Sequence, residues 1–250
     1  MDIKVLSVSF GYKQYEICSS WRSGGDELIF MIHGLGCSKE IFDGVWNYPG
    51  FEEYSILAID LLGFGRSSKP VDFSFSMEDQ ACICGEILRN SRYSKLHIVA
   101  HSMGGAVALL LPETFLTSIE SFANLEGNLI EEDCGILSRK AISVPYSQFN
   151  KEGIEYSDKE HMSLEDTSSL AYYRSAESLV EWSDSGRLLE KFRNLSCYKA
   201  YFFGEGNGDH PTVSRMDGIR QIRINKSGHF FMKDNPDEFY EKLLKIIKGR

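Results

Sequence analysis

Short apolar runs bounded by polar and turn-forming residues recur along this chain. Most of them are continuously apolar, which is typical of strands buried on both faces of a sheet, and the last one alternates apolar with polar residues. A first strand is also predicted at the N-terminus, over MDIKVLSVSF. The other predicted strands cover residues 27–32, 54–60, 96–100, 121–126, 198–204 and 221–225.

Between several of these strands the apolar positions take the spacing of amphipathic helices. Helices are predicted at 76–90, 104–111 and 234–249. Ser76 can cap the first of them, and Pro236 lies where the first turn of the last one is expected. The alternation of strands and helices predicts an α/β fold with a mostly parallel central sheet and helices on both faces.

The segment 127–190 interrupts this alternation. It is mostly polar and shows no clear strand pattern. We interpret it as an inserted helical lid, with a long functional loop as the alternative. The predicted core is then formed by 1–126 and 191–250. The aromatic residues scattered in the insert are Tyr146, Phe149, Tyr156, Tyr172, Tyr173 and Trp182.

The composition restricts the classes to which the protein can belong. Its 250 residues suit one domain with an insertion, and 42% hydrophobic residues suffice for a large core. The formal net charge of −9 argues against nucleic acid or an anionic membrane as a partner. No run of 18 apolar residues occurs, so no membrane span is expected. The first residues lack a basic start followed by an apolar block, so no signal peptide is expected.

The spacing of the cysteines and histidines bears on whether the protein has disulfide bonds or a metal site. The six cysteines form no CxxC pair, which favours reduced thiols in a cytoplasmic protein. The six histidines show neither an HExxH nor an HxH spacing, so no metal site is predicted.

One serine lies at a sharp junction between a predicted strand and a predicted helix, in AHSMGG (100–105). Such a junction strains the corner residue and requires small neighbours, here Ala100 and Gly104. The strain directs the Ser102 hydroxyl above the carboxyl edge of the sheet, where open α/β sheets bind ligands. The Met103 amide, at the start of the helix, can donate to a developing oxyanion. An ordinary turn with a capping serine is the alternative.

Two further stretches favour a catalytic role for Ser102. Leu35 follows the strand 27–32 in His-Gly-Leu-Gly, and its amide can be the second oxyanion donor. His33 in the same stretch is interpreted as a structural residue that ties the loop together. His229 lies in a glycine-bearing loop after the last predicted strand, from which an imidazole can reach the serine hydroxyl as a general base.

Four motifs together resemble those of the α/β-hydrolase fold superfamily, and the resemblance extends over nearly the whole chain. They are HGLG (33–36), DLLGFGRSS (60–68), AHSMGG (100–105) and SGHFF (227–231), the last followed by Asn235-Pro236. The resemblance implies Ser102 as nucleophile, His229 as general base and acid, and an acidic residue that holds His229. It implies no cofactor.

The acidic residue departs from the superfamily's usual pattern, because Asn207 occupies the position where the acid is expected. An amide cannot stabilise an imidazolium as a carboxylate does. Glu126, at the tip of its strand, is the preferred acid, since haloalkane dehalogenases of this superfamily can take theirs from the equivalent strand end. Those enzymes use an aspartate nucleophile, which Ser102 argues against here. Asp209 is the alternative acid and Glu205 a further one, and a purely structural role for the Glu126 carboxylate also remains open.

Three residues near these motifs are interpreted as scaffold. Asp60 is expected to bond a turn, and Arg66 is expected to pair nearby. His101, next to the serine, is expected to pack or bond beneath the site and not to transfer protons.

The sequence thus predicts a serine hydrolase acting on a small carboxylic ester or related acyl compound, and the aromatic residues of the insert suggest an apolar acyl or alcohol part. Its catalytic residues are Ser102, His229 and Glu126, with an oxyanion hole at Leu35 and Met103. Thioesterase, lactonase, amidase, C–C hydrolase and acyltransferase activities share this machinery and remain alternatives. A non-catalytic small-molecule receptor of the same fold is the alternative outside the enzymes. The oligomeric state is left open.

Overall fold

The computed structural model describes residues 1–150 and 159–249. Within them, eight strands form one sheet in the order β1-β2-β4-β3-β5-β6-β7-β8. Their bounds are β1 (Asp2–Phe10), β2 (Lys13–Arg22), β3 (Glu27–Ile32), β4 (Ser55–Ile59), β5 (Lys95–His101), β6 (Ile119–Leu125), β7 (Tyr198–Gly204) and β8 (Arg220–Ile224). The strands from β4 to β8 in this order run parallel, whereas β1 and β2 add an antiparallel hairpin at one edge.

The predicted α/β architecture is confirmed, and β3 shows why its strands are continuously apolar. Leu28, Phe30 and Ile32 lie in a core that also contains residues of α1 (Met77–Arg89), α2 (Met103–Leu109) and α6 (Arg187–Asn194). Ile29 and Met31 lie in a second core, with residues of the 3-10 helix η1 (Lys39–Trp46) and of α9 (Pro236–Ile247). Each face of the sheet therefore requires its own apolar layer.

Two elements differ from the sequence prediction. The strand β2 was not predicted, because its first residues, Lys13 to Glu16, are mostly exposed and polar. The helix predicted at 234–249 is confirmed as α9, but the short helix α8 (Phe231–Asp234) that precedes it, and that is separated from it at Asn235, was not predicted. Asn235 has φ −140° and ψ 66°, outside the helical region, because the ring of the following Pro236 disfavours helical backbone in the residue before it.

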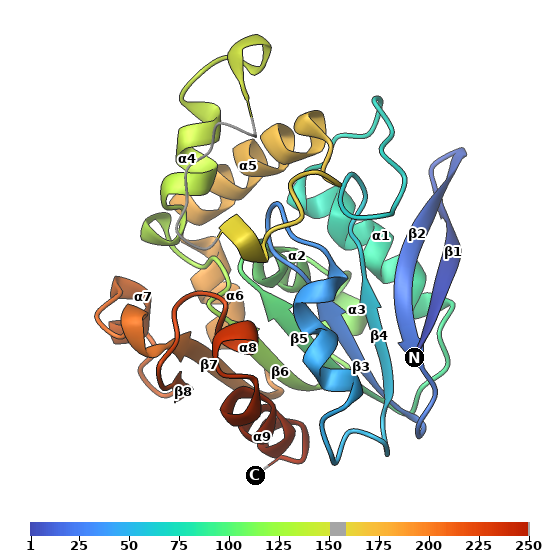
Figure 1. Cartoon of the computed structure of the whole chain (residues 1–250), viewed down its shortest axis with the longest axis vertical. Helices are drawn as coiled ribbons and strands as arrows, with labels where there is room; N and C mark the ends of the chain where they lie inside the picture. The colour runs from blue at the N-terminus through green and yellow to red at the C-terminus, as the bar shows by residue number, and fades with distance from the viewer. Residues whose placement is uncertain (151–158, 250) are drawn as a thin grey trace.

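The segment between β6 and β7 contains helices and no strand among its described residues. Besides α6, its α-helices are α4 (Ile136–Ile142) and α5 (Ser169–Asp184), which lie together at one end of the molecule, away from both chain termini (Figure 1). Its short 3-10 helices are η2 (Glu131–Asp133), η3 (Tyr146–Gln148) and η5 (Lys159–His161). The boundary predicted at residue 190 falls inside α6, whose Phe192 packs edge-on against Phe122 of β6 with ring centroids 5.6 Å apart.

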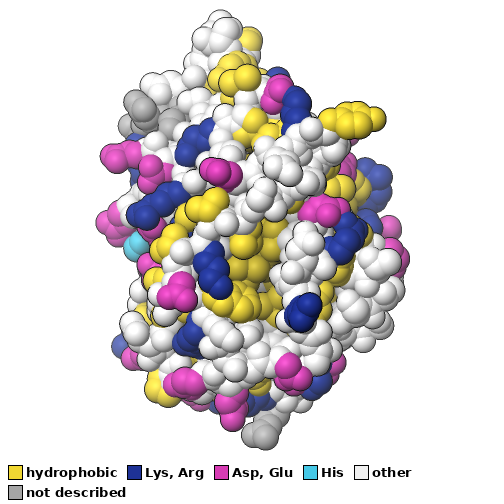
Figure 2. Space-filling view, turned by 90° about the vertical axis from the view of Figure 1, so that its right-hand side faces the viewer, with side chains coloured by type: hydrophobic (Ala, Val, Ile, Leu, Met, Phe, Trp, Pro, Cys, Tyr) yellow, Lys and Arg dark blue, Asp and Glu magenta, His cyan; other side chains and the backbone are white. Residues whose placement is uncertain are grey.

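The side of the molecule that carries the β1–β2 hairpin has a hollow with an apolar floor and basic side chains around it (Figure 2). Its lining includes Val8, Trp21, Leu57 and Ile87.

Among the helices of the described ranges, none combines the length and hydrophobicity needed for a membrane span. The remaining helices are the short α3 (Glu113–Leu116) and α7 (Pro211–Ser214) and the 3-10 helix η6 (Glu205–Asn207).

Candidate active site

Ser102 lies between the last residue of β5 and the first residue of α2, at the corner predicted from the sequence. Its φ of 51° falls in the left-handed region, which residues other than glycine rarely adopt. A Cβ on Gly104 would lie 2.4 Å from the carbonyl oxygen of Ile32, and one on Gly105 would lie 2.7 Å from the Cα of Gly127. The strained corner and the close packing of its helix therefore require glycine at both positions.

A histidine and a glutamate meet at the same edge of the sheet. Glu126 directly follows β6 with a φ of 42°, and His229 lies in the loop between β8 and α8. The Nδ1 of His229 donates a hydrogen bond to Glu126 Oε2 at 2.6 Å. Both side chains are mostly buried, with 21% of His229 and 9% of Glu126 exposed. A carboxylate in this position can orient the imidazole and stabilise its protonated form.

The Glu126 carboxylate has two further donors. The amide of Gly204, at the end of β7, donates to Oε1 at 2.8 Å. The side-chain nitrogen of Asn207 donates to Oε1 at 3.0 Å and to Oε2 at 2.9 Å. The residue at the superfamily's usual acid position thus holds the glutamate that contacts the histidine.

The two alternative acids lie elsewhere. Asp209 is exposed, and within the described chain it has no contact with His229. Glu205 Oε1 accepts from Arg223 at 2.5 Å, and its Oε2 accepts from the amide of Lys226 at 2.7 Å. Of the three carboxylates weighed from the sequence, the structure brings Glu126 to His229.

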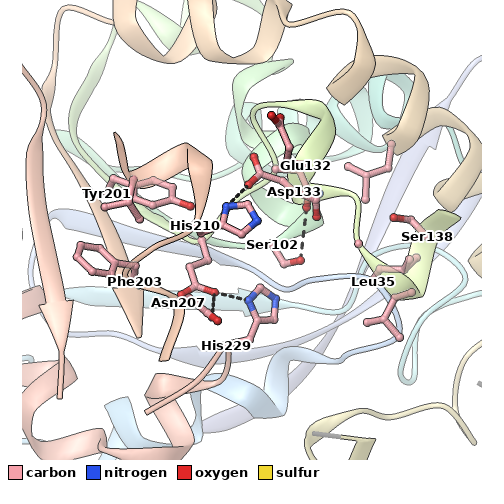
Figure 3. A pocket seen from close by; sticks show the side chains of 16 residues that line it. Leu35, Ser102, Glu132, Asp133, Ser138, Tyr201, Phe203, Asn207, His210 and His229 are labelled. Atoms are coloured by element: carbon pink, nitrogen blue, oxygen red, sulfur yellow. Dashed lines mark hydrogen bonds and ion pairs between the residues drawn. The ribbon is translucent and has the colours of Figure 1, made fainter. Parts of the chain in front are cut away.

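The hydroxyl of Ser102 bonds to a residue that the sequence analysis did not single out. Its Oγ donates to Asn128 Oδ1 at 3.5 Å, and no hydrogen bond joins it to His229 within the described residues. The backbone amide of Asn128 also donates to the backbone carbonyl of Ser102 at 3.2 Å. Asn128 follows Glu126 by two residues, and this proximity is the signal that could have identified it. Ser102 and His229 line the same pocket (Figure 3), so a rotation of the hydroxyl away from Asn128 is needed to bring it toward the imidazole.

The loop after β3 lies directly against the serine. A Cβ on Gly34 would lie 2.9 Å from the Cβ of Ser102, and Leu35 lines the pocket beside it. Within the described residues, the amides of Leu35 and Met103 donate to no other group, as an oxyanion site requires. His33 fixes this loop, because its Nδ1 donates to the carbonyl of Gly34 at 2.8 Å and its Nε2 accepts from the amide of Leu61 at 3.0 Å.

Two buried histidines lie beneath the site in neutral form. Burial lowers the pKa of His33, in accord with its Nε2 acting as an acceptor. Burial, followed by the nearby His229, holds the pKa of His101 well below the usual histidine range. His101 Nε2 donates to the backbone carbonyl of His229 at 3.1 Å, and the two ring centroids are 4.5 Å apart. His101 therefore supports the loop that carries the His229 imidazole.

A buried ion pair anchors the chain that follows the oxyanion loop. Asp60 accepts from the backbone amide of Lys39 at 2.8 Å and from its ammonium at 2.7 Å. It also accepts from the amide of Arg66 at 3.0 Å, while the Arg66 side chain reaches Glu40 at 3.8 Å. Asp60 thus bonds a turn, as expected, whereas its fully buried partner Lys39 was not predicted.

The pocket beside Ser102 has a volume of about 190 Å³ and a mixed lining. Leu179 and Phe203 contribute apolar surface, and carboxylates and histidines contribute polar surface. The second histidine on this wall, His210, was not predicted as a site residue, although it directly follows Asp209 in the turn that was searched for the acid. Among the described residues, no three His, Cys, Asp or Glu side chains gather so as to hold a metal ion.

The described aromatic residues of the insert do not line this pocket. Four of them pack against one another instead: Phe149 stacks on Tyr172 with centroids 5.6 Å apart, and Tyr146 contacts Tyr173 at 5.4 Å. The guanidinium of Arg187 lies over the Trp182 ring, 4.1 Å from its centroid. Tyr156 lies outside the described residues. The expectation that these aromatic residues shape an apolar substrate pocket is therefore wrong for the residues described, because their rings are used within the insert.

Comparisons with known proteins agree with the fold described above. A sequence model of the alpha/beta hydrolase fold matches residues 27–137. The probable lysophospholipase BODYGUARD 4 of Arabidopsis thaliana is 38% identical over 87 residues, which cover 34% of this chain and 21% of that protein. Lipase 1 of Psychrobacter immobilis is 30% identical over 122 residues, which cover 48% of this chain and 37% of that protein. The matches span less than half the length of these curated relatives.

A solved structure extends the similarity to the whole chain. An N-acyl homoserine lactonase in complex with N-butanoyl homoserine superposes with a TM-score of 0.76 at 18% identity, covering 99% of this chain and 97% of that one. At this identity the likeness concerns the fold alone. The matched range 27–137 includes Leu35, Ser102 and Glu126 and ends before His229, so the position of the histidine depends on the geometry above.

Proposed function

The chain has the α/β-hydrolase fold, and on that basis we propose that it is a serine hydrolase that cleaves a small carboxylic ester or related acyl compound through an acyl-enzyme intermediate. The observation that carries this proposal is the 2.6 Å contact between His229 and Glu126, at the sheet edge that presents Ser102 in a strained corner. The relatives named as lipase and probable lysophospholipase support an ester bond as the target.

The proposed reaction uses each group in turn. His229 takes the proton of Ser102 as the hydroxyl oxygen attacks the acyl carbon, and Glu126 stabilises the imidazolium that forms. The amides of Leu35 and Met103 bind the oxyanion of the tetrahedral intermediate, where the loss of one donor typically costs about 10²–10³ in kcat. His229 then protonates the leaving alcohol, and water releases the acyl group by the same route.

Other reactions on the same machinery are distinguished by substrate. Thioesterase, lactonase, amidase, C–C hydrolase and acyltransferase activities would all use Ser102 and His229. The receptor alternative depended on the missing acid in the usual turn. Glu126 supplies a carboxylate to His229, and Asn207 holds that carboxylate, so this argument for a receptor loses its basis.

The free cysteines support a reducing compartment. All six are unpaired, and four of them are buried. Burial raises the pKa of the Cys37 thiol to about 12, so it is inert at neutral pH. We therefore place the protein in the cytoplasm as part of this proposal.

The test is covalent labelling combined with turnover. The purified protein is treated with a fluorophosphonate probe and assayed with p-nitrophenyl acetate, and Ser102→Ala is compared with Ser7→Ala, a matched control on the exposed strand β1. We expect labelling and turnover in the wild type and in the control, and neither in Ser102→Ala. A wild-type protein that takes no label and cleaves no ester, but whose Tm rises with a small molecule, would be a receptor.

A further inference from the structure

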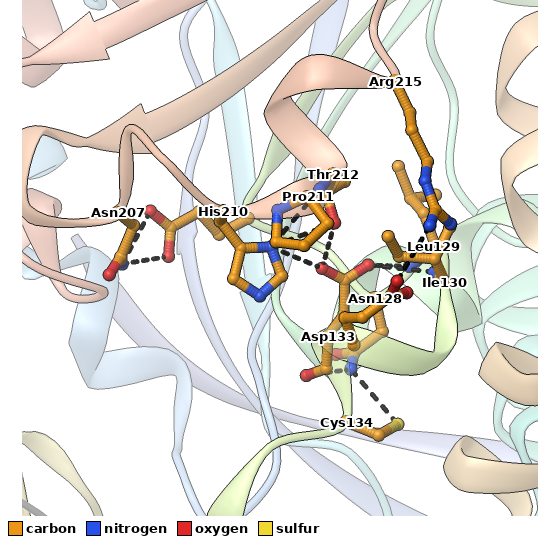
Figure 4. Close-up of polar contacts among 12 residues, drawn as sticks. Asn128, Leu129, Ile130, Asp133, Cys134, Asn207, His210, Pro211, Thr212 and Arg215 are labelled. Carbon is orange, nitrogen blue, oxygen red and sulfur yellow. Dashed lines mark hydrogen bonds and ion pairs between the residues drawn. The ribbon is translucent and has the colours of Figure 1, made fainter.

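A second histidine–carboxylate pair lies on the wall of the same pocket. Asp133, in η2, accepts hydrogen bonds at Oδ2 from the amides of Leu129 and Ile130, at 2.7 and 2.9 Å. Its Oδ1 accepts from the hydroxyl of Thr212 and lies 3.5 Å from the Nδ1 of His210 (Figure 4). The Asp133 side chain is 7% exposed. Three donors thus hold this buried carboxylate in place, and His210 is the neighbour with which it can share a proton.

The His210 imidazole is fixed on one side and open on the other. Its Nδ1 lies 3.2 Å from the Thr212 hydroxyl, 3.4 Å from the Thr212 amide and 3.5 Å from Asp133. Among the residues that the structure describes, its Nε2 has no partner. The ring is 35% exposed and lines the pocket with Ser102, with its second nitrogen turned toward the cavity (Figure 3). An oriented, unpaired nitrogen beside a nucleophile is a binding group for substrate.

The charges of this wall restrict what can bind there. Glu126, Glu132 and Asp133 all line the pocket, and none of the described lining residues is Lys or Arg. Glu132 Oε1 accepts from Arg215 at 2.8 Å, while its buried Oε2 has no hydrogen-bond partner among the described residues. An anionic group would therefore meet repulsion on this wall, and a neutral group would not.

The neutral group of the substrate that His210 can bind follows from the two neutral tautomers of its imidazole. With the proton on Nδ1, facing Asp133, the pocket-facing Nε2 is an acceptor; with Nδ1 accepting from the Thr212 amide, Nε2 is a donor. A hydroxyl both donates and accepts, so it bonds to Nε2 in either tautomer. We propose that His210 is a specificity-determining residue that binds a hydroxyl of the substrate, so that the preferred substrate is a neutral, hydroxyl-bearing ester. This inference rests on the proposed hydrolase function.

The test is a matched set of esters measured as ratios of kcat/KM. p-Nitrophenyl 3-hydroxybutyrate is compared with p-nitrophenyl butyrate, and 2-hydroxyethyl butyrate with propyl butyrate, so that the two pairs distinguish a hydroxyl on the acyl side from one on the alcohol side. We expect a preference of about tenfold for the hydroxylated member of one pair, as one well-placed hydrogen bond gives. The anionic p-nitrophenyl hemisuccinate should be cleaved with a kcat/KM about tenfold below that of the butyrate.

Variants assign the preference to His210. In His210→Leu the hydroxyl preference should fall to about one, whereas Ser214→Ala, at the exposed end of the same short helix, should keep it. His210→Gln retains a polar group of similar reach and should keep part of the preference, which covers the case in which the leucine variant does not fold. The Tm of each variant is measured alongside.

Each outcome separates this inference from the proposed function. If no ester is cleaved and Ser102 takes no label, the hydrolase proposal fails. If plain esters are cleaved as well as hydroxylated ones, or the hemisuccinate is preferred, the hydrolase stands and the role of His210 is wrong. If His210→Leu and His210→Gln both fold but lose fluorophosphonate labelling at Ser102, then His210 acts in the chemistry itself, and the inference is overturned.

Discussion

Two histidine–carboxylate pairs face one pocket, and they are built differently. His229 and Glu126 lie 2.6 Å apart and follow β8 and β6, so the sheet fixes both. His210 and Asp133 lie 3.5 Å apart and belong to a short helix cap and a 3-10 turn. The comparison supports separate proposed roles: we assign the reaction to the pair that directly follows two strands, and recognition of the substrate to the pair held by a helix cap and a 3-10 turn.

The largest effect is expected from breaking the sheet-fixed pair. Glu126→Gln removes the charge that stabilises the imidazolium, so kcat should fall by about 10³–10⁴. Steady-state turnover of p-nitrophenyl acetate, with Tm as a check on folding, measures it. Asp209→Asn is the matched control, because Asp209 is exposed and has no contact with His229 in the described chain; it should leave kcat within about twofold. A large loss in Asp209→Asn with none in Glu126→Gln would reverse the assignment.

A smaller effect is expected when the acid is moved to its usual place in the superfamily. Asn207→Asp sets a second carboxylate against Glu126, where the wild type has two donor contacts, so kcat should fall about tenfold. The double variant Asn207→Asp with Glu126→Gln restores a single carboxylate beside a single amide. Its kcat should lie at least about tenfold above that of Glu126→Gln alone. Additive losses in this cycle would show that position 207 cannot reach His229.

Acid should lower the stability of the fold through the two buried histidines beneath the site. Burial lowers the pKa of His33 and His101 in the folded state, so the unfolded chain binds more protons at these residues. The stability that these two histidines contribute is fully present above pH 6.5, which is about the pKa of a histidine in the unfolded chain. It is lost as the pH falls below that value. We expect the Tm to drop by several degrees between pH 7.5 and 5.5, at about 2–4 °C per kcal/mol. His101→Gln should flatten this drop; an unchanged slope would contradict a neutral His101.

The smallest effect is expected in the loop-held pair. Asp133→Asn keeps the shape but removes the charge beside His210, so the hydroxyl preference should fall about threefold, less than in His210→Leu. Burial raises the pKa of Asp133 while its hydrogen bonds act against the rise, so the preference should also decline in acid as this carboxyl is protonated. The ester ratios at pH 5.5 and 7.5 measure both effects. An Asp133→Asn variant with a sharper preference than the wild type would remove Asp133 as a positioning residue.

The same contrast explains what the sequence could predict. Ser102, Glu126 and His229 follow parallel strands, and the carboxyl ends of parallel strands meet at one edge, so their convergence follows from the order of elements. The pairing of Asp133 with His210 could not be predicted, because it depends on the path of two irregular loops. Lys39 was missed because its pairing with Asp60 inverts the usual exposure of lysine.

The β2 strand marks a further limit, whereas the start of α9 at Pro236 was predicted. Half of β2 is polar, since an edge hairpin needs no continuous apolar run. The break at Asn235 was readable from Pro236 alone, because the residue before proline avoids helical backbone.

The three carboxylates around the pocket have a consequence for turnover under the proposed reaction. Cleavage converts a neutral ester into a carboxylic acid that ionises at neutral pH, inside a cavity lined by Glu126, Glu132 and Asp133. The newly charged acid is repelled by the surroundings that accepted its precursor, so it leaves readily. Accumulated free acid should then inhibit the enzyme only weakly.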